Sequence, residues 1–105
     1  MDNKELERAI QEEINKIRNL GEHTRKGSDH LYFRSISKFK LSNPKKIRYE
    51  GKEVYEVKCK YDIYTETEFL HTPEMDELYT EHYQDKFIID ENLKILDIED
   101  LRKSN

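Results

Sequence analysis

The stretch that decides the fold is Val54 to Leu70, VYEVKCKYDIYTETEFL, in which side-chain character alternates with a period of two. The odd positions carry apolar, aromatic or β-branched side chains: Tyr55, Val57, Cys59, Tyr61, Ile63, Thr65, Thr67 and Phe69. The even positions are mostly charged, with Tyr64 as an exception. Because successive strand side chains point to opposite faces, this pattern predicts one buried and one solvated face. At about 3.3 Å per residue the strand would be roughly 50 Å long, so we expect it to bend or bulge and the sheet to curve.

A helix is predicted from about Asn3 to Leu20. Its apolar residues recur at steps of three and four: Leu6, Ala9, Ile10, Ile14, Ile17 and Leu20. Asp2 or Asn3 can cap the start, and Gly21 can supply the left-handed residue that ends the helix. Since the helix has a single apolar stripe, we expect it to cover one face of the sheet and to leave the other face uncovered.

The remaining chain predicts an antiparallel sheet over residues 30 to 98. A loop is expected over 23–29, and further strands over about 30–41, 45–50, 79–89 and 93–98. Ile36 falls on the opposite parity to Phe33 and Phe39, which predicts a bulge or a change of face near Ser35. Pro44 is expected to break or kink the strand that precedes it.

Three turns or ends complete the prediction. Gly51 suits a tight hairpin before the central strand, and Asn92 is expected to be left-handed in the turn 90–92. Residues 74–84 fit a helix or a strand, and a strand from about Tyr79 is favoured as a partner for the central strand. The charged tail 99–105 is expected to fray.

The length of 105 residues predicts one small domain spanning residues 1–105, and the predicted helix and strands make it an α+β domain. Only 34% of the residues are hydrophobic and 40% are charged, so seven Tyr and four Phe must supply much of the core. Neither a membrane-spanning apolar run nor the apolar stretch of a signal peptide is evident, which predicts a soluble, cytoplasmic protein. The lone Cys59 agrees with this expectation, because a disulfide framework needs pairs.

The closing stretch TEHYQDKFIIDENLKILDIED, residues 80–100, is similar to the final hairpin of many cystatin-like domains. With a single helix followed by a long meander, the chain resembles this α+β class, which includes the nuclear-transport-factor-2-like superfamily. The resemblance implies one N-terminal helix packed on a curved antiparallel sheet of four to five strands. The hairpin sequence RYEGKEVYE lacks the Gln-x-Val-x-Gly motif of the protease inhibitors, so the resemblance does not extend to protease inhibition.

Candidate catalytic residues lie in and after the central strand. Asp62 with Tyr61 and Tyr64 supplies a carboxylate and two phenols, a set that the resemblance connects with isomerases and dehydratases. His71 and His82 lie near acidic residues and could act as general bases. Asp62 shares its parity with charged residues, so a surface residue paired across strands is the alternative interpretation. The histidine spacing predicts no metal site, and no cofactor motif is present.

A basic stretch precedes an acidic one. Residues 23–60 hold eleven Lys or Arg and four acids, whereas residues 61–92 hold one Lys and ten acids. The segment KFKLSNPKKIRY interleaves cations with aromatic residues, as nucleic-acid surfaces do. Its candidate contacts are Lys38, Lys40, Lys45, Lys46 and Arg48. The alternative is a strand edge that lysines protect from aggregation.

These patterns favour a non-catalytic binding or assembly module that dimerises through its sheet. Half-buried tyrosines supply the candidate binding surface: Tyr49, Tyr64, Tyr79 and Tyr83. One alternative is a ligand binder or a lyase or isomerase that uses the concave sheet face. Another is a protein that binds or mimics nucleic acid.

Overall fold

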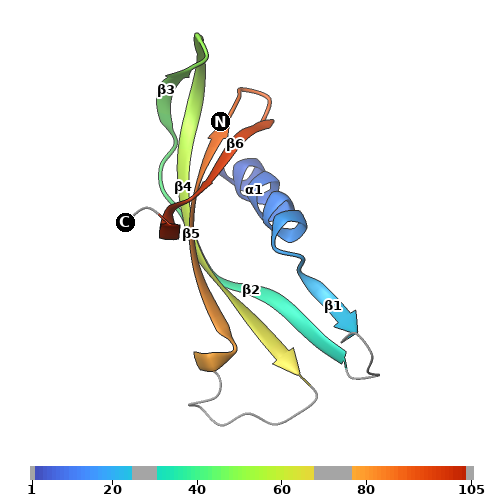
Figure 1. The fold of residues 1–105 in the computed structure, drawn as a ribbon. Coiled ribbons are helices and arrows are strands. Elements are labelled where there is room, and N and C mark those ends of the chain that lie inside the picture. Colours follow the sequence, from blue (N-terminus) through green and yellow to red (C-terminus); the bar gives the residue numbers. More distant parts are fainter. Residues whose placement is uncertain (1, 25–30, 68–76, 104–105) are drawn as a thin grey trace.

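A computed structural model describes residues 2–24, 31–67 and 77–103 of the chain. One N-terminal helix, α1 (Asn3–Ile17), packs across a strongly curled antiparallel sheet, which confirms the predicted α+β class (Figure 1). The described part of the chain forms six strands. Their bounds are Gly21–Thr24 (β1), Leu31–Leu41 (β2), Lys45–Tyr49 (β3), Lys52–Thr67 (β4), Thr80–Ile89 (β5) and Ile95–Asp100 (β6).

The sheet is built around β4, as the alternating stretch predicts. The strand order is β1-β2-β4-β5-β6, and β3 pairs with β4 outside this path. β4 and β5 stay in register from Tyr55 opposite Ile89 to Tyr64 opposite Thr80. Of the ambiguous stretch 74–84, residues 80–84 belong to β5, which confirms the strand prediction there, while residues 74–76 lie outside the described residues.

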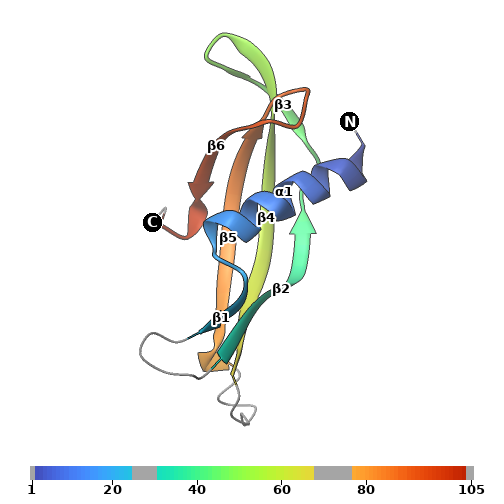
Figure 2. The ribbon, with the colours of Figure 1, turned by 90° about the vertical axis from the view of Figure 1, so that its right-hand side faces the viewer.

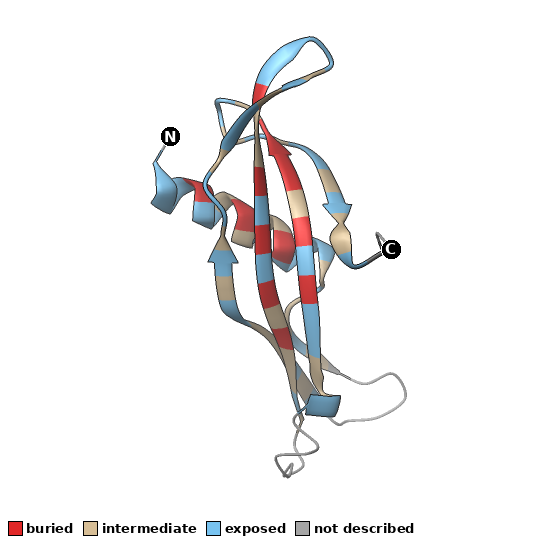
Figure 3. Ribbon diagram, turned by 90° about the vertical axis from the view of Figure 1, so that its left-hand side faces the viewer, coloured by how far each residue is buried: buried red, intermediate tan, exposed pale blue. Residues whose placement is uncertain are grey.

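The core lies between α1 and the inner side chains of β4 and β5. Leu6, Ile10 and Ile14 are at most 1% exposed, as are Val57 and Ile63. Figure 2 shows α1 lying across these strands, and Figure 3 shows the alternation of buried and exposed positions along them. The sheet curls around the helix, so α1 occupies the concave side. We call the opposite side the outer face.

A bulge in β2 resolves the parity conflict that the sequence shows at Ile36. The register shifts between Ser37 and Lys40, and Lys38 has a φ of 53°. The extra residue allows Ile36, Phe39 and Leu41 all to pack against the core. Phe33 and Leu31 keep the opposite orientation and remain 46% and 41% exposed. The expected bulge or change of face near Ser35 is therefore confirmed, and the register shift lies between Ser37 and Lys40.

β2 and β3 follow one edge of β4, interrupted at Ser42–Pro44. Leu41 pairs with Cys59 and Lys45 with Glu56, so the β2–β3 side has one residue more than β4. The Ser42 amide donates to the Lys58 carbonyl at 2.8 Å, and the Ser42 hydroxyl accepts from the Lys58 amide at 2.9 Å. These bonds replace part of the ladder that Pro44 cannot join, which confirms the predicted break.

The β3–β4 hairpin has a two-residue turn. Tyr49 pairs with Lys52, and the turn residues Glu50 and Gly51 have φ values of 51° and 80°. Positive φ at both positions is the requirement of a type I′ turn, whose twist matches that of the flanking strands. The hairpin prediction at Gly51 is confirmed, and Glu50 occupies a conformation that L-residues adopt at a cost.

The helix begins as predicted but ends earlier. The Asp2 carboxylate accepts from the Lys4 amide at 2.8 Å and caps the first turn. α1 ends at Ile17, and Asn19, with a φ of 54°, is the left-handed residue. The Leu20 amide donates to the Asn15 carbonyl at 3.2 Å, as in a Schellman motif. The prediction of Gly21 as the stop is wrong, because Gly21 begins β1.

Two further predictions about loops and ends are corrected. His23 and Thr24, expected in a loop, belong to β1. In the β5–β6 turn Leu93, with a φ of 64°, takes the left-handed conformation expected of Asn92. The Asp90 carboxylate holds this turn, because it accepts from the amides of Asn92 and Lys94 at 2.8 and 2.9 Å.

The predicted fraying of the tail is wrong for residues 99–103. Glu99 and Asp100 end β6, and a short 3-10 helix, η1 (Leu101–Lys103), follows. Arg102 anchors this segment by donating to the Asp100 carboxylate and to the His82 carbonyl. Within the described ranges, no helix has the length and apolar character needed to cross a membrane.

Candidate functional site

The structure separates the candidate catalytic residues of β4. Tyr61 faces the core and is 1% exposed, whereas Asp62 lies on the outer face beside His82 of β5. Tyr64 is half-buried on the same outer face. His71 lies outside the described residues. Tyr61, Asp62 and His82 border one surface depression, but Tyr64 does not line it and the Tyr61 hydroxyl bonds Asp85 on the core side. The set Tyr61, Asp62 and Tyr64 therefore does not form one site.

Asp62 and His82 form a cross-strand pair that Glu77 extends. His82 Nδ1 lies 2.7 Å from Asp62 Oδ1, and His82 Nε2 lies 2.8 Å from Glu77 Oε1. The hydrogen bond with Glu77, followed by that with Asp62, raises the pKa of His82. The protonated ring can donate to both carboxylates at once, so this arrangement favours a charged imidazole. With both nitrogens engaged, neither has a lone pair free to act as a general base.

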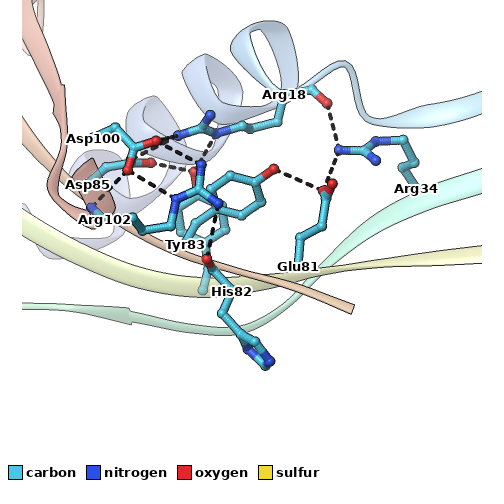
Figure 4. Close-up of polar contacts among 9 residues, drawn as sticks. Arg18, Arg34, Glu81, His82, Tyr83, Asp85, Asp100 and Arg102 are labelled. Carbon is cyan, nitrogen blue, oxygen red and sulfur yellow. Dashed lines mark hydrogen bonds and ion pairs between the residues drawn. The ribbon is translucent and has the colours of Figure 1, made fainter. Parts of the chain in front are cut away.

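A buried polar network lies on the opposite side of the same strands (Figure 4). Asp85 of β5 is 0% exposed, and its carboxylate accepts hydrogen bonds from the Tyr61 hydroxyl and from Arg18 at 2.9 Å. Arg18 Nε also donates to the Tyr61 hydroxyl at 3.1 Å. Burial and the Asp85 hydrogen bond together raise the pKa of Tyr61, so the phenol stays protonated.

Asp100 and Arg102 add a second layer to this network. The guanidinium carbons of Arg18 and Arg102 lie 4.1 and 3.9 Å from the centroid of the Tyr83 ring, which itself stacks on Tyr61 at 5.4 Å. Arg102 lies 2.8 Å from the Asp100 carboxylate, and its hydrogen bonds hold the pKa of that group well below the usual range. This layer fastens the C-terminal end of the sheet over the aromatic pair.

Glu81 and Arg34 complete the network at its exposed end. The Glu81 carboxylate accepts from the Tyr83 hydroxyl and from Arg34, each at 2.9 Å. Arg34 also donates to the Arg18 carbonyl at 3.3 Å, which ties β2 to the end of α1. The three arginines face three carboxylates, so their charges balance. We therefore interpret the network as a clamp that joins the end of α1 to β2, β5 and η1.

The sequence contained a signal for this network that pattern reasoning missed. Asp85 interrupts an apolar series on one strand parity: Tyr83, Phe87 and Ile89. A charged residue at an inward position must be paired or must shift its pKa. Its main partner, Arg18, is far away in the sequence. Judged from its neighbours alone, Arg18 is a cation near the C-terminal end of a helix, where it interacts favourably with the helix dipole. Only the three-dimensional arrangement brings the two together.

The four candidate binding tyrosines occupy different environments. Tyr49, Tyr64 and Tyr79 are half-buried. Tyr83 is only 8% exposed and lies under Arg18 and Arg102. Its ring is therefore not available on the outer surface, contrary to the expectation.

Cys59 is buried at 1% exposure. Burial, followed by the charge of Asp85, raises the pKa of its thiol to about 12, as expected of an unreactive thiol.

The candidate nucleic-acid residues divide between two places. Lys38 and Lys40 lie in β2, where Lys40 is opposite Lys60 on β4. Lys45, Lys46 and Arg48 lie on β3, and Arg48 is opposite Glu53. The continuous basic stretch of the sequence is thus broken by the Ser42–Pro44 interruption, and lysines from β4 join its first half.

Metal-ligating side chains do not gather in the described part of the chain, where no group of three or more His, Cys, Asp or Glu residues has the geometry to hold an ion.

Comparison with protein-family models, with characterised proteins and with solved structures finds no match to this chain. The fold is therefore defined at the level of its architecture, one helix on a curled antiparallel sheet.

Proposed function

We propose that this chain is a non-catalytic binding and assembly module that forms a homodimer through the outer face of its sheet. The distribution of core residues supports this proposal. Leu6, Ile10 and Ile14 of α1 fill the concave side over β4 and β5. The outer face is the broad surface of the sheet that α1 does not cover. A curved sheet covered on one side only leaves area that a second molecule can bury.

The observation that carries the proposal is the exposure of Leu31 and Phe33. These residues have the same parity on β2 and are 41% and 46% exposed, in a chain with few apolar residues to spare. They line a shallow depression of about 200 Å³ that Glu22 and Glu66 border. An apolar centre with a charged rim is the usual anatomy of a protein interface.

A second copy of the chain is the occupant that we propose. In a twofold dimer the same patch meets itself, so Phe33 can pack against Phe33 of the second copy. A stable dimer buries about 1,600 Å² in total, and the polar surroundings of the two residues would form most of that area. Placing the axis near Phe33 also keeps the lysines in the middle of the outer face away from one another.

The enzyme alternative has less support. A concave-face active site needs a cavity where α1 packs, and the inner residues Val57, Phe87 and Ile89 are fully buried there. The Asp62–His82–Glu77 group has the right chemical types, but its imidazole nitrogens are already engaged. We propose in addition that the chain is related to the cystatin-like class. We also propose that it is cytoplasmic, since its one cysteine is a buried free thiol.

Light scattering coupled to size-exclusion chromatography tests the dimer. The monomer has a mass of 12.8 kDa, and the wild-type chain should elute at twice that mass at high micromolar concentration. Phe33→Ser removes the centre of the patch and should give a monomer. Leu96→Ser is the matched control. Leu96 is 37% exposed and belongs to β6, which lies at the opposite edge of the sheet from β1 and β2.

Two results would count against the proposal. A wild-type chain that stays monomeric at every concentration would exclude the homodimer. A dimer that Leu96→Ser disrupts, and Phe33→Ser does not, would place the interface elsewhere. Because Phe33 is half-exposed, its replacement should leave the fold intact, which circular dichroism can verify.

A further inference from the structure

Four lysines form a strip along the middle of the outer face: Lys38, Lys40, Lys58 and Lys60, which we call the lysine strip. Lys40 lies directly opposite Lys60, and Lys58 lies directly opposite Lys86. Like charges at directly opposed positions destabilise a sheet. The strip concentrates positive charge in a chain whose net charge is −4. Such a concentration, maintained at a cost to stability, points to an anionic ligand.

Carboxylates compensate Lys86 beside the strip and lie near Lys38, but not near the other three lysines of the strip. Lys86 pairs with Glu99 at 2.8 Å and with Glu56 at 3.9 Å. Lys38 Nζ lies 4.0 Å from Asp62, whose other oxygen already bonds His82. Among the described residues, no carboxylate lies within 4.0 Å of the other three ammonium groups. Lys40, Lys58 and Lys60 therefore present uncompensated charge.

The surface is hollowed where β2 and β4 bring the lysines together. A depression of about 220 Å³ is lined by three lysines of the strip and by four further residues of β4 and β5: Lys38, Lys40, Lys60, Tyr61, Asp62, His82 and Tyr83. Along β4, Lys58 and Lys60 lie two residues apart, which is about 6.6 Å. The depression therefore brings three ammonium groups from two neighbouring strands to one place on the surface.

We propose that the lysine strip binds the phosphodiester backbone of nucleic acid. A protein partner is less suited to it, because protein interfaces are depleted in lysine and have apolar centres, whereas the middle of this face is charged and polar. Lysines act as point charges toward phosphates, and contacts to phosphates carry no sequence information, so the binding is independent of sequence. This inference uses residues distinct from those of the proposed dimer patch.

Fluorescence anisotropy tests the strip with a labelled oligothymidylate and with a duplex of the same length. At low salt the wild-type chain should bind, and its affinity should fall as salt rises, with a log–log slope of about −0.7 per lysine contacted on the single strand. Lys40→Gln/Lys60→Gln should weaken binding about tenfold or more and reduce the magnitude of the slope by about 1.4. Its fold should persist, because the change relieves an opposed pair of like charges.

Lys45→Gln/Lys46→Gln is the matched control, since both lysines are exposed on β3 and the change in net charge is the same. This variant should bind nearly as the wild type does. Absence of wild-type binding at low salt, or equal weakening by the two double variants, would overturn the inference. Polyglutamate that binds as tightly as the oligonucleotide would overturn it in favour of an acidic protein. Phe33→Ser, which lacks the dimer patch, should retain binding, so the two proposals can fail separately.

Discussion

Arg18 and Asp85 lie 67 residues apart in the sequence, and Arg18 donates to the Asp85 carboxylate at 2.9 Å. Asp85 is fully buried on the core side of β5, whereas Arg18 caps the end of α1. The Tyr61 hydroxyl bonds both residues. This contact therefore fixes where the helix ends relative to the middle of the sheet.

Replacement of Asp85 by Ala should destabilise the fold. The change leaves the Tyr61 hydroxyl and the guanidinium of Arg18 without their buried acceptor, and loss of one partner of a buried pair costs about 3 kcal/mol or more. Asp85→Asn keeps an acceptor and should cost less. Urea denaturation, followed by circular dichroism, measures the difference in the free energy of unfolding.

Asp97→Ala is the control for that experiment, because Asp97 is exposed on β6. Its effect should stay within about 0.5 kcal/mol. If the Asp85 and Asp97 variants unfold at the same urea concentration, the network does not hold the helix as described.

His82 should make stability depend on pH. Its pKa is raised in the folded chain above the ordinary value of 6.5, first by Glu77 and then by Asp62, while Lys38 is the nearby cation. Its contribution is therefore complete below pH 6.5 and is lost as pH rises through the raised pKa. The melting temperature of the wild-type chain should fall across this window.

His82→Gln should flatten that part of the pH profile, because the glutamine does not titrate. The comparison is made by thermal melting of both chains at matched ionic strength. Identical pH profiles for the two chains would show that the Asp62–His82–Glu77 group contributes nothing to folding.

Glu50→Asn should stabilise the β3–β4 hairpin. Glu50 has a φ of 51° before Gly51, and Asn-Gly is the preferred pair for a type I′ turn. We expect a gain of about 0.5 kcal/mol, since Asn adopts the left-handed conformation more readily than Glu. Glu53→Asn makes the same chemical change in β4 opposite Arg48 and should give no gain. If the two changes raise the melting temperature equally, the gain comes from the loss of one negative charge and not from the conformation of the turn.

Local periodicity was sufficient to predict the main elements. The alternation from Tyr55 to Ile63 and the apolar stripe of α1 each depend on residues a few positions apart, and both are present in the structure. The bulge was predictable as an irregularity, because Ile36 breaks parity, although its position at Lys38 depends on the pairing with β4.

Features that depend on distant residues were not predictable in this way. Leu93 takes a left-handed conformation that Asn92 would adopt more easily, and it packs against the core while Asp90 holds the turn. The clamp around Asp85 and the lysine strip both require knowledge of which strands are neighbours. The order of the strands in the sheet determines which residues meet in these sites. Short sequence patterns do not reveal that order.

The proposed use of the outer face is tested most directly by two-dimensional NMR of the amide groups as the protein concentration rises from low to high micromolar. If the chain dimerises through this face, the signals of Phe33, Ser35 and Glu66 on the outer face shift, while those of Leu6, Ile10 and Ile14 in α1 stay constant. Shifts confined to α1, or spectra that do not change with concentration, would contradict it.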